Sequence, residues 1–134
     1  MKEKYEKLIL LTSGFPYGKG ENFLEKEIKI LASKFKEVLI ISCSPSSDES
    51  RETPENVHTI IFKSTKSRTF RTMISKSFLS EFLSNLFSNP LKNKVAINSW
   101  FIATELTIQI QEHITPNTIL YSYWLDDKAL ALSI

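Results

Sequence analysis

The feature that most constrains this chain is a short apolar run followed by a loop that holds all three of its glycines. The run, residues 8–11, contains no polar residue, which is typical of a strand buried on both faces. The loop spans residues 12–20. Apolar residues at steps of three and four then predict an amphipathic helix over residues 23–35. This order of strand, glycine loop and helix predicts the first part of a βαβ unit.

The rest of the chain predicts an α/β domain. Residues 38–41 form a second apolar run close behind the predicted helix, so the two strands are expected to be parallel. Two further strands are predicted over residues 57–62 and 118–124, and two further helices over 68–87 and 92–114. The polar segment 42–53 is predicted to be an exposed loop. We therefore predict one Rossmann-like domain over residues 1–134, a three-layer α/β/α arrangement with a mostly parallel sheet.

The glycine loop has features of an anion-binding loop. Gly14, Gly18 and Gly20 allow positive φ and leave backbone N–H groups accessible, and the following helix N-terminus suits a phosphate. Asn22 and Glu25 have the spacing of a capping box at that helix. However, the glycine spacing matches neither a P-loop nor the G-x-G-x-x-G motif. A surface turn that needs glycines is therefore an equally good interpretation.

Two aromatic residues end the last predicted strand. In open parallel sheets, ligands bind beyond the carboxyl ends of the strands, at the point where the strand order reverses. If the first and last strands are neighbours, Tyr123 and Trp124 line the same crevice as the glycine loop. The alternative is that both aromatics only cover the hydrophobic core.

Several features indicate a cytoplasmic protein. The single cysteine, Cys43, cannot form an internal disulfide, which favours a reducing compartment. The residues before the first apolar run are charged, and no segment approaches the roughly 20 apolar residues of a membrane span. Cys43 is interpreted as a structural cysteine rather than a catalytic thiol. His58, which has no partner residues in the pattern, is expected to face solvent or a sheet edge rather than a ligand. The final residues read as a helix without a stop signal, so we expect a piece of a longer protein.

Basic residues are concentrated in one region. Residues 63–94 contain seven basic residues and one acidic residue, although the whole chain has a net charge of only +2. The predicted helix over 68–87 is interpreted either as a core helix with a solvated cationic face or as a helix on an anionic membrane surface. In the second case the contacts are Lys63, Lys66, Arg68, Arg71 and Lys76. No recognition module accompanies the charge, so nucleic acid is not predicted as a partner.

Two segments resemble a known family. Residues 10–28, LLTSGFPYGKGENFLEKEI, resemble the start of bacterial glycosyltransferases of family 4, which often open with a strand, a Phe-Pro and glycine loop, a Glu and a Phe-Leu-x-x-Glu helix. Residues 121–125, YSYWL, are similar to the segment that closes the fourth major strand in that group. The resemblance implies a GT-B architecture of two Rossmann-like domains. This chain would supply the N-terminal, acceptor-side domain, without the C-terminal nucleotide-sugar domain.

The resemblance also implies a function. The full-length protein would be a retaining, hexosyltransferase-type glycosyltransferase that moves a sugar from a nucleotide-sugar donor to a polysaccharide or lipid-linked acceptor, without a metal or other cofactor. Many relatives have a histidine where this chain has Tyr123-Trp124. No catalytic residue is predicted here, and the chain alone is expected to be inactive. The predicted substrate-binding residues are Gly14, Phe15, Pro16, Gly18, Gly20, Glu21, Tyr123 and Trp124.

Two alternatives belong to other classes. One is a non-enzymatic Rossmann-like domain that binds a ligand or a protein partner. The other is a P-loop-like nucleotide binder, which the absence of Ser or Thr after Lys19 disfavours.

Overall fold

The computed structural model describes residues 5–64, 80, 90–124 and 126–133. The chain divides into two compact units, Met1–Lys63 with His113–Trp124, and Ser64–Glu112 with Leu125–Ile134. This division does not test the prediction of a single domain over residues 1–134, which stays a prediction. The helix predicted over residues 68–87 lies, apart from Ser80, outside the described residues.

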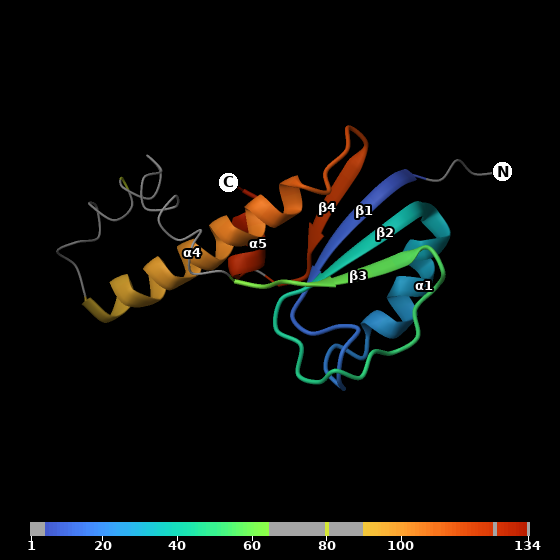
Figure 1. Ribbon diagram of the computed structural model, residues 1–134, viewed down its shortest axis with the longest axis horizontal. Coiled ribbons are helices and arrows are strands. Elements are labelled where there is room, and N and C mark those ends of the chain that lie inside the picture. The colour runs from blue at the N-terminus through green and yellow to red at the C-terminus, as the bar shows by residue number, and fades with distance from the viewer. Residues whose placement is uncertain (1–4, 65–79, 81–89, 125, 134) are drawn as a thin grey trace. The chain divides into compact units, whose positions relative to one another are not determined.

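The first unit contains a four-stranded parallel sheet with α1 on one face (Figure 1). Every pairing is parallel and the strand order is β3-β2-β1-β4. The Rossmann-like α/β fold predicted from the sequence is therefore confirmed. The elements of this unit are β1 (Tyr5–Thr12), α1 (Leu24–Lys34), β2 (Phe35–Ser42), β3 (Val57–Ile61) and β4 (Thr118–Ser122).

The strand order reverses at β1. Leu8 of β1 pairs with Val38 of β2 on one side and with Ile119 of β4 on the other. The chain adds β2 and then β3 on the first side before it returns to add β4 on the second. Because the strands are parallel, the loop after β1 and the segment after β4 leave the same edge of the sheet. This edge is where open α/β sheets bind ligands.

The core of the first unit explains why its strands read as unbroken apolar runs. Leu8, Leu10, Val38 and Ile40 pack with the buried face of α1, formed by Leu24, Ile28 and Ala32. Side chains alternate between the two faces of a strand. Ile9, Leu11, Leu39 and Ile41 therefore point away from α1, and they are buried as well. A sheet buried on both faces needs apolar residues at consecutive positions.

The ends of α1 differ from the sequence-based prediction. No side-chain hydrogen bond caps its N-terminus, so the predicted capping box of Asn22 and Glu25 is wrong. The backbone carbonyls of Glu21 and Asn22 accept hydrogen bonds from the first N–H groups instead. Phe35 begins β2 rather than ending the helix. Asn56 satisfies the helix C-terminus, because its Nδ2 donates to the carbonyls of Ala32 (2.9 Å) and Phe35 (3.0 Å).

The second unit contains α4 (Pro90–Gln111) and α5 (Asp127–Ala131). The two helices pack together, and Thr107 Oγ1 donates to the carbonyl of Ala131 at 2.8 Å. The predicted helix over residues 92–114 is confirmed with slightly different bounds. Ala103, Leu106 and Ile110 form its buried face. Among the described helices, none is long and apolar enough to cross a membrane.

Candidate functional site

The glycine loop and the aromatic segment contact each other at the carboxyl ends of β1 and β4. The indole Nε1 of Trp124 donates a hydrogen bond to Glu21 Oε1 at 2.8 Å. The sequence analysis placed both segments at one edge if the first and last strands are neighbours. β1 and β4 are neighbours in the sheet, so this condition is met. The candidate site is therefore built from two segments that lie about a hundred residues apart in the chain.

The carboxylate of Glu21 folds back onto the glycine loop. Its Oε2 accepts hydrogen bonds from the N–H groups of Gly14 and Phe15, both at 2.8 Å, and its Oε1 accepts one from Ser13 at 3.1 Å. Glu21 itself has a φ of 54°, which is uncommon for a residue with a side chain. Of the three glycine N–H groups that the sequence assigned to a bound anion, the one of Gly14 is thus occupied by a carboxylate of the chain itself.

These hydrogen bonds decide the charge of Glu21. Burial raises the pKa of its carboxyl, whereas the hydrogen bonds from the Trp124 indole and from the N–H groups of Gly14, Phe15 and Ser13 lower it. The lowering prevails, because hydrogen bonds to the charged form of a carboxyl stabilise that form. Glu21 is therefore ionised at neutral pH.

The guanidinium of Arg51 binds carbonyl groups of the same glycine loop. Its Nε donates to the carbonyl of Gly18 at 2.8 Å, its Nη2 donates to the carbonyl of Gly20, and its Nη1 pairs with Glu25 at 2.8 Å. The guanidinium carbon also lies 5.2 Å from the centre of the Phe15 ring, within cation–π range. Arg51 and Glu21 together therefore satisfy both acceptors and donors of the loop backbone.

The segment that carries Arg51 was predicted only as an exposed loop, and this description is incomplete. Residues 42–53 run beside the glycine loop (Figure 1). The N–H of Gly18 donates to the carbonyl of Glu49 at 3.1 Å, and the N–H of Arg51 donates to the carbonyl of Pro16 at 3.0 Å. The sequence offered no signal for this pairing, because a serine-rich polar stretch indicates a loop without indicating its neighbour.

Only one of the three glycines needs the conformational freedom of glycine. Gly18 has a φ of 68°, and a Cβ there would lie 2.2 Å from Ser46 Oγ. Gly20 has open space around the position of a Cβ, and neither Gly14 nor Gly20 has a positive φ. The structure therefore supports a conformational requirement at Gly18 and leaves Gly20 replaceable.

The other predicted site residues divide between the core and the surface. Phe15 is fully buried, Pro16 is also buried, and Tyr123 packs against the core. Trp124 is 44% exposed. The ring of Phe23 lies edge-on to both aromatics, with centroids 5.2 Å from Tyr123 and 6.4 Å from Trp124. The alternative that the aromatics only cover the hydrophobic core therefore fits Tyr123, whereas Trp124 remains available to a ligand.

A polar pocket of about 530 Å³ lies between the glycine loop and the 42–53 segment. Within it, Arg51 and Glu25 compensate each other's charge. The exposed Lys19 and Glu49 and three serines provide further charged and polar groups, which suit a hydroxylated ligand. The pocket is lined by Gly18, Lys19, Asn22, Glu25, Ser46, Ser47, Glu49, Ser50 and Arg51.

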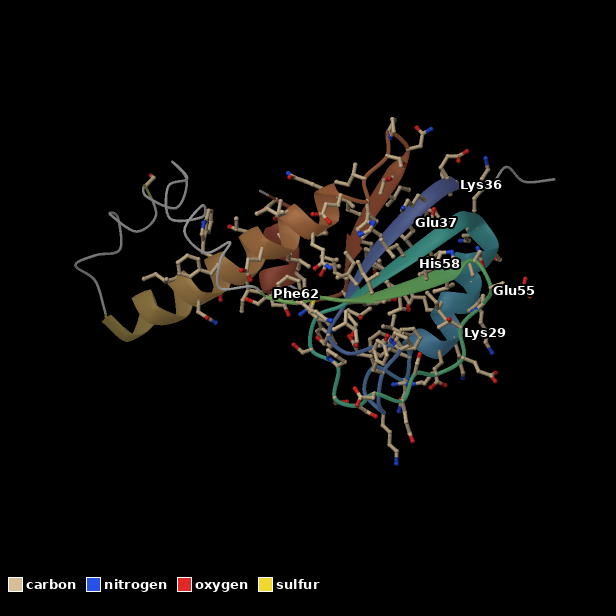
Figure 2. The ribbon with its side chains drawn as sticks, viewed as in Figure 1. Lys29, Lys36, Glu37, Glu55, His58 and Phe62 are labelled. Carbon is tan, nitrogen blue, oxygen red and sulfur yellow. The ribbon has the colours of Figure 1, made fainter. Side chains whose placement is uncertain are left out.

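The remaining candidates lie elsewhere. His58 is exposed on the edge strand β3, and Figure 2 shows it with Lys36 and Glu37 toward the amino ends of the strands. Cys43 is half-buried, and its Sγ donates to the carbonyl of Ile41 at 3.8 Å. Lys63 is exposed. The other predicted membrane contacts, Lys66, Arg68, Arg71 and Lys76, lie outside the described residues.

Comparisons with known proteins add no relative. No protein-family model, curated protein or solved structure matches the chain. In the described part of the chain, no three His, Cys, Asp or Glu side chains gather into a group that would hold a metal. The candidate site is accordingly interpreted from its geometry.

Proposed function

We propose that this chain is the acceptor-side, N-terminal domain of a retaining glycosyltransferase of the GT-B type. The full-length enzyme moves a sugar from a nucleotide-sugar donor to a polysaccharide or lipid-linked acceptor. In this proposal the enzyme works in the cytoplasm, where Lys63 and the basic residues after it contact the membrane that carries the acceptor.

One observation carries the proposal. The glycine loop after β1 and the aromatic segment after β4 are joined by the hydrogen bond between Glu21 and Trp124, at the point where the strand order reverses. This is the position at which α/β sheets bind ligands. The two segments are also the ones that resemble family 4 glycosyltransferases.

The residues of the site suit substrate positioning rather than chemistry. Glu21 is engaged by four hydrogen-bond donors, so it serves poorly as a general base or nucleophile. Lys19 is exposed on the same loop and lines the polar pocket, where its ammonium suits a phosphate or a sugar hydroxyl. The leaving group and the donor nucleotide are assigned to a second domain outside this chain.

The test is a screen of the full-length protein for glycosyl transfer and for hydrolysis of nucleotide sugars. Gly18→Val and Glu21→Ala are assayed beside the unaltered protein, with circular dichroism to establish that each variant is folded. We expect turnover with at least one nucleotide sugar and a loss of at least about tenfold in kcat/KM in both variants, because both disturb the loop that positions the acceptor.

A matched control separates a local effect from a general one. Lys36→Ala removes a charge at the amino end of β2, away from the loop, and is expected to leave turnover unchanged. Turnover that survives in folded Gly18→Val and Glu21→Ala would remove the glycine loop from the active site. No turnover with any donor would favour a non-enzymatic ligand-binding domain.

A further inference from the structure

Trp124 presents an unusual combination of exposure and restraint. The only polar group of its side chain, the indole N–H, donates a hydrogen bond to Glu21, yet the residue is 44% exposed. Buried tryptophan N–H groups ordinarily find a partner while the ring is buried as well. Here the indole N–H is paired within the protein, and the residue as a whole is still exposed. Such an arrangement exposes aromatic area to a binding partner.

The indole ring of Trp124 is oriented by the carboxylate of Glu21, and this carboxylate is itself fixed by other hydrogen bonds. Three backbone N–H groups of the glycine loop anchor the carboxylate of Glu21, and the Phe23 ring lies at 74° to the indole. A surface ring normally loses rotational freedom when a ligand binds to it. A ring that is already oriented avoids most of this cost, so it binds more tightly for the same contact area.

The position of the ring favours a small ligand. Trp124 follows β4 directly, beside the glycine loop at the carboxyl edge of the sheet, where α/β sheets bind small molecules. The face of an indole ring carries negative potential. The C–H groups on one face of a pyranose ring are apolar and partly positive, and the sugar hydroxyls point outward toward neighbouring polar groups.

We propose that Trp124 is a stacking platform for a pyranose ring, and that Glu21 is a positioning residue that orients this platform. The identification of this pyranose as a unit of the acceptor glycan rests on the proposed function. Glu21, which the sequence assigned as a ligand contact, acts here through Trp124. The sugar stacks on the indole face and does not displace the carboxylate from the loop.

The experiment uses full-length protein with ¹⁵N-labelled tryptophan, in which Trp124→Phe identifies the Trp124 indole resonance. The probes are maltose, cellobiose, lactose and di-N-acetylchitobiose. Sorbitol, which has hydroxyls but no ring face, is the control. We expect at least one disaccharide to shift the Trp124 resonance saturably while sorbitol does not. Trp124→Leu is expected to weaken the binding of that disaccharide about tenfold.

The positioning role of Glu21 has its own readout. Glu21→Gln is expected to weaken disaccharide binding about threefold in the native background. In the Trp124→Phe background, which has no indole N–H to hold, the same substitution is expected to have no further effect. An equal loss in both backgrounds would show that Glu21 acts by another route and would overturn this part of the proposal.

Failure of the platform and failure of the proposed function are distinguishable. No shift with any disaccharide, or unaltered binding by folded Trp124→Leu, overturns the platform even if the enzyme transfers sugar. Disaccharide binding that depends on Trp124, in a protein without transferase activity, supports the platform and rejects the proposed function. If both hold, Trp124→Leu raises the acceptor KM and leaves kcat nearly unchanged.

Discussion

The two ends of the parallel sheet hold their charged groups in different ways. At the amino end, Lys7 pairs with Glu37 at 3.0 Å and Lys36 pairs with Glu6; Figure 2 labels Lys36 and Glu37. The side chains of Lys36 and Glu6 are 59% and 49% exposed. At the carboxyl end, Glu21 and Arg51 bind mainly to backbone groups of one loop. The charges at this end therefore determine the shape of a loop.

The difference follows from what each end must satisfy. Backbone N–H and carbonyl groups withdrawn from water need partners, and a nine-residue loop with little regular structure leaves many of them unpaired. A carboxylate supplies acceptors and a guanidinium supplies donors. Glu21 and Arg51 perform these two tasks for the glycine loop, whereas the strands at the amino end already satisfy each other. Substitutions at the two ends should therefore have unequal effects.

The largest effect is expected from Glu21→Ala. The substitution leaves three backbone N–H groups and the Trp124 indole without their acceptor, and we expect the free energy of unfolding to fall by about 2–3 kcal/mol. Chemical denaturation measures this value. Glu37→Ala is the matched control, because it removes a carboxylate from an ion pair at the amino end, with an expected loss below about 1 kcal/mol. Equal losses would contradict the proposed difference between the ends.

A somewhat smaller effect is expected from Arg51→Ala. The side chain is 16% exposed, and its removal leaves the carbonyls of Gly18 and Gly20 without their charged donor. We expect a loss of about 2 kcal/mol by chemical denaturation. Arg51→Lys keeps the charge but cannot reproduce the planar set of donors, so about half of the loss should remain. Full stability in the Lys variant would show that charge alone holds the loop.

The glycines offer a comparison within the loop. Gly18→Ala places a side chain at a φ of 68° and against Ser46, so we expect a loss of about 1–2 kcal/mol. The Cβ of Gly20→Ala would have no atom of the described residues within 4 Å, apart from its chain neighbours, and the substitution is expected to change stability by less than about 0.5 kcal/mol. Thermal or chemical unfolding of the pair measures the difference. A destabilised Gly20→Ala with an unaffected Gly18→Ala would reverse the assignment.

The sequence was informative where structure depends on local pattern. The apolar runs at residues 8–11 and 38–41 predicted buried parallel strands, because a sheet covered on both faces requires such runs. The glycine loop was recognised as a candidate site from the position of its glycines before a helix. The position of Tyr123 and Trp124 at the end of the last predicted strand placed both aromatics at the same edge as the glycine loop. This placement required the first and last strands to be neighbours, which the sequence did not establish.

The sequence was uninformative where structure depends on contacts between distant residues. Arg51 binds a carbonyl 33 residues away, and the indole of Trp124 binds a carboxylate 103 residues away. No motif or residue spacing in the sequence indicates either contact. Glu21 was predicted to face a ligand on the basis of the resemblance alone. Nothing local indicates that a positive φ lets its carboxylate bind residues 13–15. The capping box failed for a similar reason, since Glu25 pairs with Arg51.

Acid should weaken the contacts that Glu21 makes at the carboxyl end. The pKa of Glu21 is lowered in the folded protein, so its ionised form stabilises the fold at any pH above the ordinary glutamate value of about 4.3. This contribution is lost as the pH falls from that value through the lowered pKa. The difference in unfolding free energy between the unaltered protein and Glu21→Gln should therefore be constant near neutrality and shrink below pH of about 4. A constant difference down to the lowest pH at which the protein folds would contradict this.

The smallest effect is expected at the amino end from Lys36→Ala. Both partners of the Lys36–Glu6 pair are more than one third exposed, so water and salt screen their attraction and both side chains lose rotational freedom when they pair. We expect a change in unfolding free energy within about 0.5 kcal/mol. Denaturation in low and high salt measures it, and the small difference should disappear at high salt. A loss as large as that of Arg51→Ala would mean that exposed pairs at the amino end stabilise the sheet as strongly as the loop contacts do. The hypothesis that charged residues contribute unequally to stability at the two ends of the sheet would then have to be abandoned.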